Sequence, residues 1–212
     1  MVRFMLISVA LAVVAAGCTP AYRVHVNTYA EPDLTLSQAA SIYVLTDPNS
    51  ANPILRRQIV SKMTQLLEGY GYNPVDKVEA ADYILTFTAG IDSERVVDYM
   101  PLHMPYYGFY GRRFGGWRFG YTTYVPYADT VYTHWLRMRL YVAEADAGGD
   151  EGLVWLGEAV TGTGSPELRE AVDYLLVGCI EHFGQDTREW VTMKIAEDDP
   201  RILGIVMGGS VE

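Results

Sequence analysis

The clearest indication of the fold comes from the segment Trp135-Leu-Arg-Met-Arg-Leu-Tyr-Val142. Its apolar residues at positions 136, 138, 140 and 142 alternate with their neighbours, which predicts a strand with one buried face. A turn-rich segment, Asp146-Ala-Gly-Gly-Asp150, separates it from a second apolar run at residues 153–160. Two such runs joined by a short polar turn predict a β-hairpin.

A helix is expected to follow this hairpin, with Ser165 as its N-cap and Pro166 at its first position. Its apolar residues recur at helical spacing: Leu168, Val172, Leu175, Leu176, Cys179, Ile180 and Phe183. Residues 190–195 then predict a closing strand.

The first half of the chain predicts strands at residues 22–28, 41–45 and 81–88. Between the second and third, Asn52 and Pro53 begin a helix that ends at Gly69. Its apolar stripe is Leu55, Ile59, Met63, Leu66, Leu67 and Tyr70.

Together these elements predict an α+β two-layer sandwich, in which two helices pack on one face of a mixed or mainly antiparallel sheet. The chain has 212 residues and is 50% hydrophobic, enough for one domain with a real core. We expect that domain to occupy residues 18–212. Its C-terminal tail, residues 197–212, carries no pattern from which a structure is predicted.

Residues 95–128 form a Tyr/Gly/Arg-rich insertion between the two halves. From Tyr106 to Tyr127 it holds three arginines and no acid, within an acidic chain. Aromatic rings interleaved with arginine are suited to stacking on sugars or to binding a polyanion. The candidate binding residues are Arg112, Arg113, Trp117, Arg118 and Tyr121. Two alternatives remain open: a long loop whose aromatics pack back on the sheet edge, and a segment that drives self-association.

No catalytic constellation emerges from the sequence, so we expect a non-enzymatic protein without a metal or other cofactor. Gly162-Thr-Gly164 lies between a strand and a helix, but Glu167 at the helix start would repel a pyrophosphate. The four histidines have no paired spacing. Cys179 falls within an apolar helical stripe, where a free cysteine acts as a small hydrophobe.

The N-terminus predicts export and lipidation. Arg3 precedes an apolar run at residues 4–16, which is shorter than the roughly 20 residues needed to cross a bilayer. We therefore expect residues 1–17 to be a signal peptide. Ala15-Ala-Gly-Cys18 resembles the bacterial lipobox, and this resemblance implies that Cys18 carries a covalent lipid whose acyl chains hold the domain at a membrane. Thr19 then favours the outer membrane, in the inner leaflet and facing the periplasm.

The net charge of the chain argues against some classes of binding partner. With 16 Lys+Arg and 26 Asp+Glu, the formal net charge is −10, which argues against nucleic-acid binding. Removing residues 1–17 takes away only Arg3 among the charges, which leaves 15 basic and 26 acidic side chains, or −11. Such a domain is expected to stand off from anionic headgroups.

Several short motifs occur in order along the chain: Val-x-Val-Asn-Thr-Tyr at residues 24–29, Gly-Tyr-Gly-Tyr at 69–72, Ala-Ala-Asp-Tyr-Ile-Leu at 80–85 and Gly-Leu-Val-Trp-Leu-Gly-Glu-Ala at 152–159. With the lipobox, this order resembles the bacterial lipoproteins of the family DUF4136, over about residues 22–196. The resemblance implies an envelope lipoprotein with no assigned activity. We expect a binding or scaffolding module whose partner is an envelope glycan or another envelope protein; an accessory lipoprotein of an envelope transporter and an envelope hydrolase are the alternatives.

Overall fold

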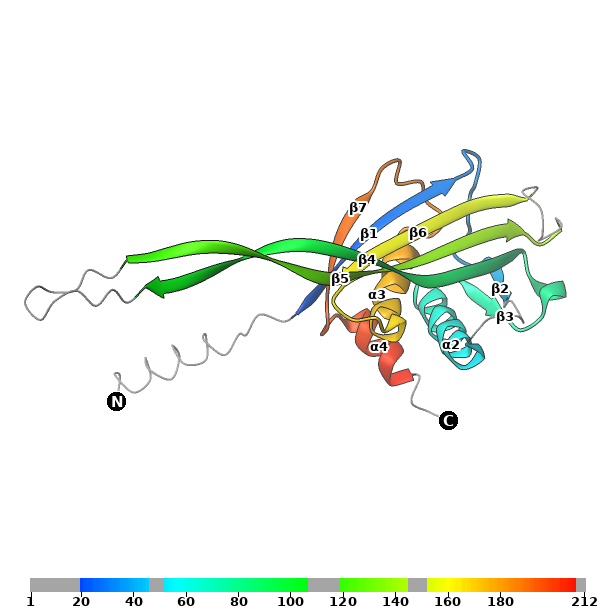
Figure 1. The fold of residues 1–212 in the computed structure, drawn as a ribbon. Helices are drawn as coiled ribbons and strands as arrows, with labels where there is room; N and C mark the ends of the chain where they lie inside the picture. Colours follow the sequence, from blue (N-terminus) through cyan, green and yellow to red (C-terminus); the bar gives the residue numbers. More distant parts are fainter. Residues whose placement is uncertain (1–19, 46–51, 107–118, 145–151, 209–212) are drawn as a thin grey trace, which may run out of the picture.

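The protein is built on one seven-stranded sheet, seen in a computed structural model that describes residues 20–45, 52–106, 119–144 and 152–208 (Figure 1). The strand order is β3-β2-β4-β5-β6-β1-β7. Strand β2 pairs in parallel with β3 and β4, and the remaining neighbours are antiparallel. The strands are β1 (Ala21–Ala30), β2 (Ser41–Leu45), β3 (Asn73–Val75), β4 (Tyr83–Tyr106), β5 (Phe119–Val142), β6 (Leu153–Thr163) and β7 (Val191–Ala196). The predicted α+β class with a mixed sheet is confirmed.

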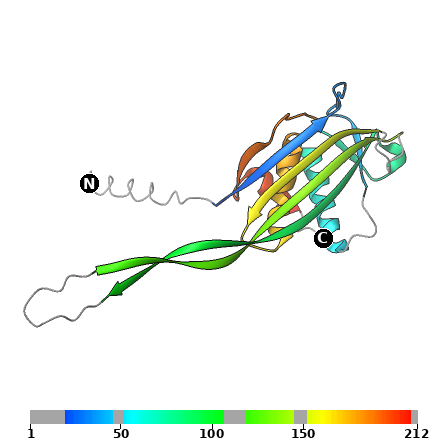
Figure 2. The same cartoon turned by 45° about the horizontal axis from the view of Figure 1, so that its top comes forward.

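In the described part of the chain, three helices cover one face of the sheet and leave the other open (Figure 2). They are α2 (Pro53–Gly69), α3 (Leu168–Glu181) and α4 (Pro200–Gly208); a short 3₁₀ turn, η1 (Val78–Ala80), precedes β4. Two of the helices were expected, and α4 was not. All three bury apolar side chains against the sheet or against each other.

The hairpin of β5 and β6 lies at the centre of the core, as its sequence pattern predicts. Leu136, Met138 and Leu140 are at most 1% exposed and face the helices. On β6, the Trp155 indole is buried against Phe183, at a ring distance of 4.7 Å, and its Nε1–H donates to the Gln185 carbonyl at 3.1 Å. The alternation in the sequence therefore places the helix-facing side of the sheet correctly.

Helix α2 begins as predicted, because the Asn52 side chain accepts a hydrogen bond from the Leu55 N–H at 3.0 Å. The predicted start of α3 was wrong. Glu167 is at its N-cap, and the Ser165 hydroxyl accepts a hydrogen bond from the Glu167 N–H, before the first turn of the helix. Every residue of α3 from 171 to 180 is buried, because the sheet, α2 and α4 surround this helix.

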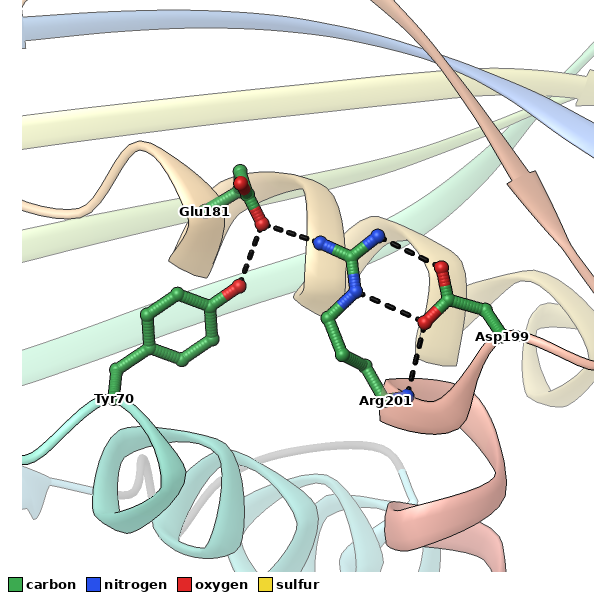
Figure 3. A network of polar contacts seen from close by, with 4 residues as sticks. All are labelled: Tyr70, Glu181, Asp199 and Arg201. Carbon is green, nitrogen blue, oxygen red and sulfur yellow. Dashed lines mark hydrogen bonds and ion pairs between the residues drawn. The ribbon is translucent and has the colours of Figure 1, made fainter.

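Helix α4 lies within the C-terminal tail, for which no structure was predicted. Ile202 and Ile205 enter the core. The Arg201 guanidinium donates to both carboxylate oxygens of Asp199 and contacts Glu181 at the end of α3, and Tyr70 donates to the same Glu181 oxygen at 2.6 Å (Figure 3). This network ties α4 to the ends of α2 and α3.

Strands β4 and β5 extend well beyond the predicted limits of Thr88 and Trp135. Their pairing is continuous from Tyr83–Val142 to Tyr106–Phe119. In its described part, the expected insertion is an extension of these two strands, and it projects from the sheet (Figure 1). Within the described parts of the chain, no helix has the length and apolar character needed to span a membrane.

Candidate functional site

Most of the predicted binding residues lie outside the described residues. Arg112, Arg113, Trp117 and Arg118 are all among residues 107–118, and Cys18 precedes the first described residue. Tyr121 lies on β5, opposite Met104 of β4. The binding role of these side chains stays a prediction.

The structure instead shows a hollow on the open face of the sheet. Its volume is about 350 Å³, and it lies beside the point where β4 and β5 leave the sheet. The lining residues come from β4, β5, β6 and the loop that precedes β7: Asp92, Thr133, Trp135, Leu136, Arg137, Glu158, Val160 and Trp190. Two indoles beside a few polar groups are typical of a small-molecule or oligomer subsite, since apolar surface supplies affinity and polar groups orient the ligand.

Trp135 is held against the sheet by the glycine opposite it. Gly90 pairs directly with Trp135 across β4 and β5. A Cβ atom at Gly90 would lie 2.5 Å from Cζ2 of the indole, so the ring occupies the space that a side chain would fill. This contact fixes the ring orientation on a face that none of the described helices covers.

Arg137 and Glu158 provide the charged part of the hollow. They are opposite each other in the β5–β6 register, with the Arg137 Nε–H donating to Glu158 Oε1 at 2.8 Å. The Arg137 side chain is 46% exposed, so the pair adds about 1 kcal/mol or less to stability. Its clearer consequence is a guanidinium and a carboxylate fixed side by side next to Trp135.

Trp190 lines the hollow from the end of a loop that is hydrogen-bonded to the C-terminal end of β1. The Thr28 N–H donates to the Thr187 hydroxyl at 2.9 Å, and the Thr187 N–H donates to the Thr28 carbonyl. Arg188 adopts a φ of 61°, with its N–H bound by the Asp186 side chain. These hydrogen bonds hold the loop in a defined conformation. The Trp190 side chain that follows the loop is 50% exposed.

Two other reactive groups, Cys179 on α3 and His134 on β5, are not among the residues that line the hollow. Burial raises the pKa of the Cys179 thiol, and the side chain is 0% exposed. His134 is also buried, and desolvation holds its pKa below the ordinary value of 6.5. Among the described residues, no group of three or more His, Cys, Asp or Glu side chains is placed to hold a metal ion.

The model of the family described as "Domain of unknown function (DUF4136)" matches residues 23–183. The chain belongs to this family. The match confirms the family that the sequence motifs indicated. No curated protein matches the chain.

Solved structures similar to this DUF4136 chain have low identities. A PDZ domain protein from Parabacteroides distasonis is 14% identical, with a TM-score of 0.47; the match covers 88% of this chain but spans 42% of that protein. The PelC dodecamer from Paraburkholderia phytofirmans is 12% identical over 76% of this chain and 98% of that one, with a TM-score of 0.42. A DUF4136 family protein from Bacteroides thetaiotaomicron is 20% identical over 74% and 89%, with a TM-score of 0.33.

The DUF4136 match includes the strands that carry most of the hollow, and it ends before Trp190 and α4. The sequence pattern already predicted that Trp135 and Arg137 point away from the core, since both alternate with buried leucine and methionine. No pattern in the sequence indicated that Trp190 and Glu158 lie beside Trp135 and Arg137, because their proximity depends on the strand order of the sheet.

Proposed function

We propose that this DUF4136 protein is a lipid-anchored, non-enzymatic binding module of the bacterial cell envelope, held by acyl chains on Cys18 at the outer membrane. We propose further that the hollow on the open sheet face binds a sugar chain of the envelope. The observation that carries this proposal is the placement of Trp135 and Trp190 around a hollow of about 350 Å³.

The chemistry of the hollow suits a sugar ring. Indole faces offer flat apolar surface, as does the C–H face of a pyranose. The guanidinium of Arg137 and the carboxylate of Glu158 supply donors and acceptors for hydroxyl groups beside that face. An open sheet face is also accessible along its length, which suits a polymer better than a closed pocket would.

The absence of an activity is also part of the proposal, and two observations support it. The Cys179 thiol is buried with a raised pKa, so it is not the thiolate that nucleophilic catalysis needs. In the hollow, the Glu158 carboxylate is paired with Arg137.

Binding is tested by titrating the mature chain with soluble peptidoglycan fragments while following tryptophan fluorescence. We expect a saturable change that Trp135→Ala and Trp190→Ala each weaken at least tenfold, because each removes one stacking face. Tyr99→Ala is the matched control, since Tyr99 is 61% exposed and is not among the lining residues. Equal binding by all three variants would reject the hollow as the site, and no saturable change would reject the glycan as ligand.

A further inference from the structure

The outer part of β4 and β5 is a two-stranded ribbon that extends past the neighbouring strands. Strand β6 makes its last pair with β5 at Tyr132–Thr163, and β2 makes its last pair with β4 at Thr86. From Glu94–Val131 out to Tyr106–Phe119, the two strands pair with each other and with no other described strand. We call these residues, 94–106 and 119–131, the arm. At about 3.3 Å per residue, its thirteen pairs extend about 40 Å.

One face of the arm is uncharged beyond its base. Residues directly opposite in an antiparallel pair share a face, so the pairs Val97–Ala128, Tyr99–Pro126 and Pro101–Tyr124 lie together. We call these six residues the uncharged face, and all six are exposed, with Val97, Tyr99 and Tyr124 at 59%, 61% and 66%. The opposite face carries three carboxylates near the base of the arm, Glu94, Asp98 and Asp129, and exposed apolar side chains farther out, at Met100, Leu102 and Val125.

An exposed apolar surface on a ribbon needs an explanation. Two strands alone have no layer beneath them in which to bury such residues and are marginally stable in water. Contiguous exposed apolar surface marks a place of contact with another molecule or a membrane. The uncharged face is therefore a candidate for such a contact.

The arm leaves the sheet at the end where the chain enters it. The Thr161 hydroxyl near the end of β6 donates to the Arg23 carbonyl near the start of β1 at 2.8 Å. The end of β6 also pairs with Tyr132 of β5, next to the arm. Strands β1 and β5 flank β6, so the start of β1 lies two strand spacings, about 10 Å, from the base of the arm. Figures 1 and 2 both show this proximity.

The tether between Cys18 and the sheet is short. Cys18 precedes Ala21, the first residue of β1, by three residues, which span about 10 Å at most. A lipid on Cys18 would hold this end of the sheet close to the bilayer despite the net charge of the mature domain. An arm of about 40 Å that starts at the same end then reaches the lipid surface.

The backbone edges and side chains of the arm determine which part of the bilayer it can contact. The hydrocarbon core has no partners for the free backbone edges of an open ribbon, so the arm cannot cross it alone. At the interface, water and headgroups satisfy those edges, and tyrosine rings are favoured there. The carboxylates of the opposite face would be repelled by anionic headgroups, whereas the uncharged face carries no acid.

We propose that the arm lies along the bilayer surface with its uncharged face against lipid. The occupant of this face is the surface of a lipid bilayer, and the contact sets the orientation of the domain on that membrane. This inference rests on the proposed anchoring at Cys18.

The test places a probe on the arm while an artificial anchor replaces the lipid. Residues 18–212 with Cys18→Ser and an N-terminal hexahistidine tag are held on vesicles of phosphatidylethanolamine, phosphatidylglycerol and a nickel-chelating lipid. Tyr124→Cys is labelled with an environment-sensitive nitrobenzoxadiazole dye, which spares Cys179 because that thiol is fully buried. Tyr29→Cys, on β1 and away from the arm, is the control position.

We expect the dye at residue 124 to shift to the blue on vesicles and the dye at residue 29 to stay unchanged. Val97→Glu should remove at least half of the shift. Val96→Glu, one residue away on the opposite face and 40% exposed, should leave the shift in place.

An unchanged dye at residue 124 would overturn the proposal, as would a shift that Val97→Glu and Val96→Glu affect equally. A blue shift that grows with protein concentration in the absence of vesicles would also overturn it, and would identify a second copy of the chain as the partner. Because the tag supplies the anchor, failure here is separate from failure of lipidation at Cys18.

Discussion

Gly157→Ala should destabilise the protein strongly, because Gly157 makes room for the buried indole of Trp155. A Cβ atom at residue 157 would lie 2.4 Å from Cη2 and 2.7 Å from Cζ2 of the Trp155 indole. It is 1% exposed, packs edge-on against Phe183 and donates its N–H to Gln185. Overpacking of this kind costs about 1–3 kcal/mol, and a displaced indole hydrogen bond adds about 1 kcal/mol.

The expected loss of unfolding free energy is therefore about 2–4 kcal/mol, or a fall in Tm of roughly 5–15 °C for a domain of this size. Urea unfolding followed by circular dichroism measures the free energy, and a thermal melt measures Tm. Gly162→Ala is the matched control on the same strand, because a Cβ atom there meets nothing within 4 Å. A loss below about 0.5 kcal/mol for Gly157→Ala, or equal losses for both variants, would refute the packing of Trp155 described above.

Three further changes test other parts of the fold. Leu176→Ala should cost about 2–5 kcal/mol, because this side chain of α3 is 0% exposed; a near-zero loss in urea unfolding would contradict the buried face of α3. Arg201→Ala should cost about 1–2 kcal/mol and speed hydrogen exchange in α4, since it leaves Asp199 and Glu181 without their cation; unchanged exchange in residues 200–208 would show that α4 is held by packing alone. Desolvation lowers the pKa of His134 in the folded state, so the unfolded state takes up a proton more readily, and stability should fall as the pH drops below about 6.5. His134→Gln should make that fall shallower between about pH 7 and pH 5, and an identical slope for both proteins would reject the assignment.

Much of the sheet and both long helices could be predicted from local patterns. The alternation around Leu136, Met138 and Leu140 determines which side of β5 is buried, and the Asn52–Pro53 pair determines the start of α2. Both signals depend on residues close together in the sequence, where the physical cause is local.

The arm could not be predicted in the same way, because its sequence is rich in residues that usually end strands. Pro101, Pro105 and Pro126 lack an N–H donor, yet each lies on a strand with a free outer edge, where no donor is required. Helix α4 was missed because a nine-residue helix that contains glycine has a weak signal of its own, and its formation depends on Ile202 and Ile205 entering the core.

The candidate site was predictable only in part. The outward direction of Trp135 and Arg137 followed from alternation. The proximity of Trp135 and Arg137 to Glu158 and Trp190 depends on the register of β5 with β6 and on the loop that precedes β7. These are long-range features, and a single sequence does not encode them in any local pattern.

The proposal that this DUF4136 protein is fixed to a membrane through Cys18 underlies both its proposed function and the orientation of its arm. Its most direct test is mass spectrometry of the N-terminal peptide from protein isolated from its native host, with fractionation of the same cells. The account predicts a mature chain that begins at Cys18, carries covalent acyl groups and is recovered with the outer membrane, and a Cys18→Ala variant that is not acylated. A chain with an unmodified amino terminus, recovered in the aqueous fraction after cell disruption, would contradict it.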